Sequence, residues 1–430
     1  MSLKNSFFSL AVIISLTLCF NSKVVSAQTP QLERRTPNMP LPELHFPEGK
    51  TVVEVPFEVE RNLMVIPLSI NGSRPLRFIL DTGAQGTFLQ NMQIADSLNL
   101  KIAGKVGVRG AGGGGARREA SLAENVTFNI GGIELRNGGL AVFPSPLGPQ
   151  AMASHDGAIG RVVFATLVVE VDWEKKVVRF YEPSKYKYTG SGTILPLTFD
   201  EGGRPYTTAS VAITEGRSIP VKLVVDTGAS HALSLDVGSN PEIKVPEGAA
   251  KVVLGRGASG EVTGYMGRSK SLQIGGQMLL NVPTTFPDAS SAMSGSNGRQ
   301  GNLGEGVLRR FKTIYDYSRK RMIVEPNKFF SEPFPTAPNA PTTQTLSPAM
   351  LQDYTGHYGE RTISFEDGAL YLQRQGGPKI KLVFASKDEF TLEPIPEARI
   401  KFVRDERGKV TELDVLNREG AWEKSRREQP

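Results

Sequence analysis

Two acids in this chain, Asp81 and Asp226, each open the same tetrapeptide, Asp-Thr-Gly-Ala. Each follows a short apolar run, residues 78–80 or residues 223–225, which predicts a buried strand that ends at the acid. Two such units can bring two carboxylates to one place. Carboxylates held close together cannot both ionise, so their pKa values separate and they share one proton. Such a pair can act as general base and general acid in the same step.

The surroundings of the two acids are repeated as well. A proline precedes each acid by six residues, and an Ile-Gly-Gly triplet, a pair of glycines and a further acid follow it. The matching positions are Pro75 and Pro220, residues 130–132 and 274–276, Gly157 and Gly160 with Gly301 and Gly304, and Asp172 with Asp316. The two leading acids are 145 residues apart and the later matches 144. This long period predicts duplication of a whole domain rather than a solenoid repeat.

The duplicated units resemble tandem retropepsin-like aspartic protease domains, fused in one chain as the two lobes of pepsin are. The family pattern is an apolar strand into Asp-Thr-Gly, a glycine-rich hairpin, then two apolar residues and a glycine. The last part reads Ala158-Ile159-Gly160 in the first unit and Asn302-Leu303-Gly304 in the second, where Asn302 departs from the apolar expectation. The resemblance covers residues 52–326 and implies an all-β fold, with two retropepsin-like β-barrel lobes forming a pseudo-dimer.

The resemblance further implies that Asp81 and Asp226 are the catalytic pair. A water held between them would attack a peptide carbonyl, with no covalent intermediate, no metal and no cofactor. In Thr82-Gly83 and Thr227-Gly228, the threonines would exchange hydrogen bonds between the two acid loops and the glycines would let the backbone turn tightly beneath the acids. The residues alone leave two alternatives open, carboxylates that only cap strand-end amides and threonines that bond local turn amides.

Two glycine-rich segments follow the acids. Residues 110–115 lack the Lys-Ser/Thr pair and the helix that a phosphate-binding loop needs. In the retropepsin-like frame this segment falls where a flap covers the substrate, so Gly112 and Gly113 are candidate substrate contacts. Residues 255–267 form the matching hairpin, in which Tyr265 is a candidate flap aromatic or an ordinary strand-face tyrosine. The four histidines show no ligand-like spacing, and no metal site is expected.

The amino terminus predicts a secretory signal peptide over residues 1–27. Lys4 precedes an apolar stretch, residues 7–20, that is too short to span a membrane, and a small-residue cleavage site ends at Ala27. An uncleaved anchor is the alternative. Cys19, the only cysteine, would leave with this segment, which excludes disulfides and thiol catalysis from the mature chain. We expect a secreted or periplasmic bacterial protein with no stable membrane anchor after processing.

The remainder of the chain divides by composition into proline-rich segments and segments of alternating apolar runs, which predict β-strands. The alternating segments also contain two candidate short helices, at residues 90–98 and 306–311. The expected order is a proline-rich leader (28–50), a first lobe (51–185), a second lobe (186–330), a proline-rich linker (331–348) and a C-terminal accessory β domain (349–430) with a hairpin turn at Asp367-Gly368.

The leading hypothesis is an exported aspartic endopeptidase that acts on peptides or proteins and pairs its two lobes within one chain as a monomer. A peptide-binding protein that keeps the fold without turnover is the alternative, and pairing of lobes between two molecules is a second. A glycosidase also uses two carboxylates but is not expected to place both in one repeated motif. The net charge of +6 comes from scattered basic residues, which does not favour nucleic-acid binding.

Overall fold

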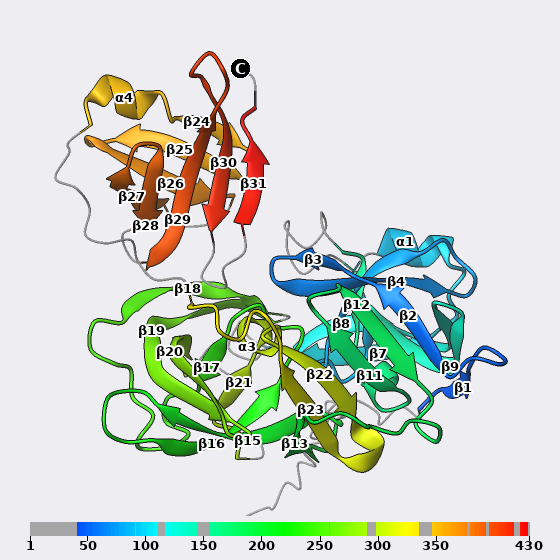
Figure 1. Cartoon of the computed structure of the whole chain (residues 1–430). Coiled ribbons are helices and arrows are strands. Elements are labelled where there is room, and N and C mark those ends of the chain that lie inside the picture. Colours follow the sequence, from blue (N-terminus) through cyan, green and yellow to red (C-terminus); the bar gives the residue numbers. More distant parts are fainter. Residues whose placement is uncertain are drawn as a thin grey trace, which may run out of the picture. The chain divides into compact units, whose positions relative to one another are not determined.

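The computed structural model describes residues 41–90, 92–110, 117–144, 155–257, 259–289, 298–334, 346–375, 379–392, 395–416 and 422–428. The predicted signal peptide and the leader up to residue 40 lie outside these residues. The described elements are almost all strands, so the all-β prediction is confirmed (Figure 1). None of the helices in the described ranges is long and apolar enough to cross a membrane.

The first lobe is a closed barrel. Its strands pair in the order β1-β9-β6-β10-β5-β4-β8-β7, and β8 also pairs with β9, which closes the ring; β3 adds to β4. The strands are β1 (Glu43–His45), β3 (Glu58–Glu60), β4 (Leu63–Ile70), β5 (Leu76–Leu80), β6 (Thr87–Leu89), β7 (Ile102–Arg109), β8 (Arg117–Ile130), β9 (Ile133–Val142) and β10 (Gly157–Ile159). Because β1 pairs with β9, the end of the leader is an edge strand of this lobe.

The second lobe repeats this barrel. Its order is β14-β15-β16-β21-β17-β20-β19-β18, and a further pairing of β15 with β19 closes it. The strands are β14 (Thr198–Phe199), β15 (Pro205–Ala212), β16 (Ile219–Val225), β17 (Leu233–Leu235), β18 (Ala250–Gly257), β19 (Gly260–Ile274), β20 (Gln277–Pro287) and β21 (Gly301–Leu303).

In each barrel, one short strand lies between the strand that ends at the acid and the strand that follows the acid. In the first lobe β10 runs parallel to β5 and antiparallel to β6, and in the second β21 does the same between β16 and β17. A side chain at the first position of these strands would meet a carbonyl of the neighbouring strand, at 2.1 Å from Phe88 O for Gly157 and 2.1 Å from Ser234 O for Gly301. This close approach explains why both repeats have glycine there.

A six-stranded sheet joins the two lobes. Its order is β13-β23-β22-β11-β12-β2, so three strands of one lobe continue into three of the other (Figure 1). The two halves meet where β11 pairs antiparallel with β22, with Val169 opposite Tyr315. The strands are β2 (Val52–Pro56), β11 (Val168–Asp172), β12 (Val177–Tyr181), β13 (Thr193–Pro196), β22 (Phe311–Asp316) and β23 (Arg321–Pro326). This continuous pairing makes the two lobes a pseudo-dimer within one chain.

The helices are short. They are α1 (Met92–Ser97), α2 (Arg161–Phe164), α3 (Glu305–Leu308), the 3-10 turn η2 (Tyr317–Arg319) and α4 (Pro348–Gln352). The helix expected at residues 90–98 is α1. The one expected at 306–311 starts and ends earlier, since buried Phe311 already opens β22.

The second lobe is packed beyond the expected boundary at residue 330. Arg310 is buried and donates to the carbonyl oxygens of Phe329 and Glu332. Its guanidinium also lies 3.7 Å from the ring centre of Phe334, which is itself buried. The first part of the proline-rich linker is therefore held against the lobe as far as Phe334.

The C-terminal domain is an eight-stranded antiparallel meander with its own aromatic core, in which Tyr354, Phe390 and Phe402 pack together. The turn predicted at Asp367-Gly368 joins β25 to β26, and both residues have the positive φ that a tight hairpin requires. Its strands are β24 (Gly356–Tyr358), β25 (Arg361–Glu366), β26 (Ala369–Arg374), β27 (Lys379–Ser386), β28 (Glu389–Leu392), β29 (Ile395–Arg404), β30 (Val410–Leu416) and β31 (Trp422–Arg426).

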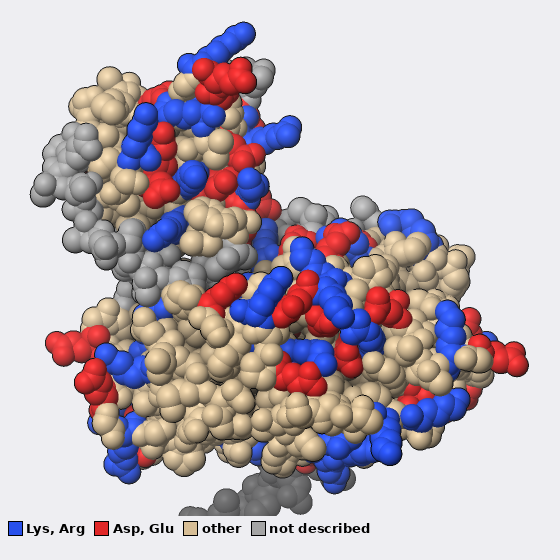
Figure 2. All heavy atoms as spheres, in the orientation of Figure 1, with Lys and Arg blue, Asp and Glu red and all other residues tan. Residues whose placement is uncertain are grey.

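Basic and acidic side chains are interspersed on the face of the molecule seen in Figure 2. Basic and acidic side chains also pair on the central sheet, where Arg179 on β12 forms ion pairs with Glu54 and Glu170 at 2.8 Å each. Local neutralisation of this kind leaves little net field on that part of the surface.

Candidate active site

The two acids lie at the ends of equivalent strands. Asp81 directly follows β5 and Asp226 directly follows β16. The backbone N–H of each acid donates to the last residue of the neighbouring short strand. Asp81 N bonds to Ile159 O on β10 and Asp226 N bonds to Leu303 O on β21, both at 2.9 Å. The strand pattern of each repeat thus delivers a carboxylate to the same place in its lobe.

The threonines after the acids join the two loops. Thr82 N donates to Thr227 Oγ1 and Thr227 N donates to Thr82 Oγ1, both at 2.9 Å. Each hydroxyl then donates across the interface, Thr82 to Val225 O and Thr227 to Leu80 O, both at 2.7 Å. Both threonines are buried. These four bonds are symmetric between the lobes and fix the separation of the two acid loops.

The glycines after the threonines leave room for the opposite acid. A Cβ on Gly83 would lie 2.5 Å from Asp226 Oδ1, and a Cβ on Gly228 would lie 2.2 Å from Asp81 Cγ. Neither glycine has a left-handed φ. The sequence interpretation proposed that these glycines are needed for backbone freedom, and this reason is wrong. The reason is that each carboxylate packs directly against the backbone of the other loop.

The two carboxyl groups influence each other's protonation. Burial raises the pKa of Asp81 well above its usual value, and the negative charge of Asp226 raises it further. Hydrogen bonds from the backbone N–H groups of Gly83 and Ala84 to Asp81 Oδ1, at 2.7 and 3.1 Å, offset only part of this effect. The two carboxyls therefore do not both ionise readily, and one proton is shared between them.

The environment of Asp226 differs from that of Asp81. Asp226 Oδ1 accepts from Gly228 N at 3.0 Å, and its second oxygen, Oδ2, accepts from the side-chain amide of Asn302 at 2.7 Å. Asn302 is the residue that departs from the apolar pattern of the motif. The sequence interpretation treated it as a weaker match, whereas the structure brings it into contact with one of the two acids.

Comparison with known proteins identifies the two lobes. The sequence model of the aspartyl protease family matches residues 66–163 and residues 209–308, one stretch in each barrel. The two lobes belong to the aspartyl protease family. Among solved structures, the aspartic proteinase from Irpex lacteus is similar at 16% sequence identity, covering 65% of this chain and 99% of that chain with a TM-score of 0.44. A search of curated proteins found no match.

The hairpins that correspond to the two predicted flaps of the aspartyl protease lobes are β7–β8 and β18–β19. Gly110, at the end of the first, donates its N–H to the hydroxyl of Ser259 at the turn of the second, at 2.9 Å. Gly112 and Gly113 lie outside the described residues. Tyr265 is half-buried on β19, where its ring packs on the core and faces Lys251 at 5.6 Å, a placement that fits a strand-face tyrosine.

One buried carboxyl close to the pair was missed by the sequence analysis. Glu305, the first residue of α3, is fully buried and near enough to Asp226 to feel its charge. Burial raises the pKa of Glu305 well above its usual value, and Arg309 and Trp173 offset only part of the rise. The sequence does contain a signal for Glu305, since the equivalent position in the first repeat is Arg161. A change of charge sign between duplicated positions indicates that the two side chains have different environments.

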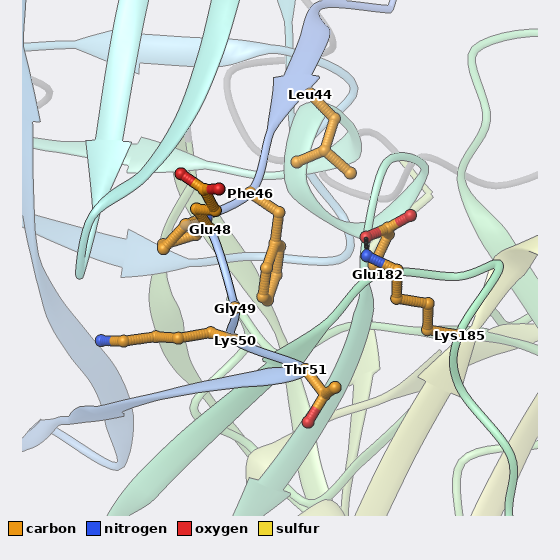
Figure 3. Close-up of a pocket in the computed structure, with 9 residues that line it drawn as sticks. Leu44, Phe46, Glu48, Gly49, Lys50, Thr51, Glu182 and Lys185 are labelled. Carbon is orange, nitrogen blue, oxygen red and sulfur yellow. Dashed lines mark ion pairs between the residues drawn. The ribbon is translucent and has the colours of Figure 1, made fainter.

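Outside the acid site, the described residues form a surface pocket but no metal-binding cluster. Within the described part of the chain, no group of three or more His, Cys, Asp or Glu side chains is arranged to hold a metal ion. A surface pocket of about 450 Å³ lies where the end of the leader and the first residue of the first lobe, residues 44 and 46–51, meet Glu182 and Lys185 (Figure 3). The last two form an ion pair at 2.7 Å, and none of the pocket residues belongs to the acid motifs.

Proposed function

We propose that this protein is an aspartic endopeptidase that hydrolyses peptide bonds with Asp81 and Asp226. The observation that carries the proposal is the hydrogen-bonded exchange between Thr82 and Thr227, which holds two equivalent acid loops face to face. Two partly buried carboxyls that share one proton provide a base and an acid at the same moment. Membership of both lobes in the aspartyl protease family supports this reading.

The reaction follows from the protonation of the pair. A water between the carboxyls transfers one proton to Asp226 while its oxygen bonds to the peptide carbonyl carbon, and Asp81 transfers its proton to the carbonyl oxygen. The product is a neutral gem-diol. The amide nitrogen then takes the proton from Asp226 as the carbon–nitrogen bond breaks, and a hydroxyl proton of the diol returns to Asp81. Both acids regain their starting states, so neither a metal nor a covalent intermediate is part of the cycle.

The test is peptide-library cleavage by the mature chain between acid and neutral pH, with Asp81→Asn and Asp226→Asn as variants. Each should lose about a hundred- to ten-thousandfold in rate, because an amide cannot carry out either proton transfer. The double variant should be little worse than each single one, since residues that act as a unit are not additive. Asp156→Asn, an acid whose carboxylate accepts from Arg77 N, is the control and should retain activity.

Turnover by either folded single variant at close to the parent rate would contradict a shared pair. Tight binding of peptides without cleavage by the parent would favour a peptide-binding protein instead. We further propose that the enzyme is exported and acts as a monomer. This proposal is supported by the apolar stretch at residues 7–20 with a small-residue cleavage site ending at Ala27, and by the pairing of β11 with β22 within one chain.

A further inference from the structure

We propose that Asn302 is a positioning residue that makes the two acids unequal, so that Asp226 serves as the base and Asp81 as the acid. The inference rests on the proposed function and adds to it a residue outside the two Asp-Thr-Gly-Ala motifs. Its starting point is that the main-chain contacts of the two acids and the threonine exchange are nearly the same in the two lobes, whereas the chemistry requires one charged and one neutral carboxyl.

The backbone around the acids is nearly the same in the two lobes. Ala84 N and Ala229 N donate to Asp81 O and Asp226 O, both at 3.3 Å. The threonine exchange is matched to within 0.1 Å on both sides. Neither set of bonds distinguishes the two carboxyls. The bond from Ala84 N to Asp81 Oδ1, which has no counterpart on Asp226 among the described residues, favours a charge on Asp81. A bias toward a charged Asp226 must therefore come from side chains that the two lobes do not share.

Asn302 occupies a position whose counterpart in the first lobe cannot form a hydrogen bond from its side chain. On β21, Asn302 is paired with Val224 and Ser234. On β10, the equivalent residue Ala158 is paired with Ile79 and Phe88. The register places both residues one step before the strand end, next to the strand that carries the acid. Only the second lobe therefore has a side-chain donor at this point.

The hydrogen bonds are distributed differently on the two carboxyls. On Asp226 the two oxygens each accept one bond, from Gly228 N and from the Asn302 amide. On Asp81 the bonds from Gly83 N and Ala84 N both reach Oδ1. A proton on Asp226 would have to compete with a donor on either oxygen, whereas Asp81 Oδ2 can take the proton without disturbing these backbone bonds.

The orientation of the Asn302 amide is determined by the same contact. Asn302 is buried, so its bond to Asp226 is little screened by water. Turning the amide over would put its oxygen where Nδ2 now lies, 2.7 Å from a carboxylate oxygen, and two acceptors repel each other at that distance. The donor orientation favours the ionised form of Asp226.

The decisive variant is Asn302→Leu, which keeps the volume and removes the donor. Loss of a hydrogen bond to a charged group should make Asp226 easier to protonate and move the acid limb of the pH profile of kcat/KM upward by about one unit. Thr285→Val, which removes a buried hydroxyl from the same sheet without contact to either acid, is the control and should leave the limb unchanged. A uniform loss of activity in Asn302→Leu with an unmoved acid limb would overturn the proposal.

A second measurement does not depend on peptide hydrolysis. The side-chain carboxyl carbons of the aspartates can be titrated by 13C NMR without substrate, and the signals of Asp81 and Asp226 assigned by their loss in the two Asn variants. In the parent, Asp226 should bear most of the first ionisation of the pair, and in Asn302→Leu its titration should move to higher pH. If Asp81 ionises first in the parent, the role of Asn302 is wrong even if the protein is an active protease and even if Asn302→Leu does not fold. If the parent cleaves no peptide but titrates as expected, the proposed function fails and the role of Asn302 stands.

Discussion

The close approach of each acid loop to the opposite carboxylate gives a steric prediction for Gly83→Ala. The added Cβ would lie 2.5 Å from Asp226 Oδ1 and 2.6 Å from its Cγ, whereas ordinary contact begins at 3.4 Å. One loop must therefore retreat by roughly 1 Å. The Asp226 carboxylate cannot do so freely, because Gly228 N and the Asn302 amide hold its two oxygens.

The magnitude follows from the size of this displacement. A misplacement of about 1 Å at reacting groups costs on the order of a hundredfold in rate, and overpacking a buried contact costs about 1–3 kcal/mol of stability. We expect kcat/KM for a cleaved peptide to fall about a hundredfold and the midpoint of thermal unfolding to fall by roughly 3–10 °C. Gly228→Ala should be at least as severe, since its Cβ would lie 2.2 Å from Asp81 Cγ.

The matched control is Gly86→Ala, three residues further along the same loop. Its Cβ would meet only the ring of Phe88, at 3.6 Å, which is an ordinary contact. This variant should keep the parent rate and unfolding midpoint. A Gly83→Ala protein with parent kinetics would refute the close approach of the two loops. Equal damage in Gly86→Ala would show that the loss comes from backbone stiffening rather than from the opposite carboxylate.

Three further predictions concern stability, length and processing. Glu305→Gln should be more stable than the parent at neutral pH. Because the pKa of Glu305 is raised, the folded state holds this proton more tightly than the unfolded chain, and the parent loses stability as the pH rises above 4.5. Thermal unfolding measured from pH 4 to 8 should show a smaller loss of stability in the variant. A chain that ends after Phe334 should fold and cleave short peptides, whereas one that ends at Ser331 should unfold at lower temperature because Arg310 loses Glu332 O and the Phe334 ring; equal midpoints would contradict this. Exported protein should begin at Gln28 in amino-terminal sequencing, and a retained apolar segment would contradict the signal peptide.

The local features of the acid site could be predicted because they depend on short stretches of sequence. An apolar run before Asp81 predicts the strand β5, and the second copy of the motif predicts an equivalent lobe. The recurrence of Gly157 and Gly301 also had a physical cause that a repeat can signal, since both strands lie against a neighbouring carbonyl. Duplication thus predicted the pseudo-dimer without knowledge of any long-range contact.

The long-range pairing could not be predicted in the same way. Alternation of apolar residues indicates which face of a strand is buried but not which strand lies beside it. The union of β11 and β22 in one sheet is therefore visible only in the structure. The reason for Gly83 was likewise hidden, because the atom that excludes a side chain belongs to Asp226 in the other lobe.

Fusion of two lobes in one chain has a chemical consequence that a symmetric dimer cannot share. In a dimer of identical chains both acids begin with the same neighbours, so any inequality must come from the substrate or from the shared proton. In this chain, equivalent positions of the two lobes hold different residues. Beside the acids, the first lobe has Ala158 where the second has Asn302. Three residues later, the first lobe has Arg161 and the second has Glu305, whose backbone N–H groups donate to Ala84 O and Ala229 O respectively. Asn302 bonds to one acid, and Glu305 is a buried carboxyl near that same acid. Under the proposal made above, these differences assign the base and the acid before a substrate arrives, while the symmetric threonine bonds keep the geometry of both loops unchanged.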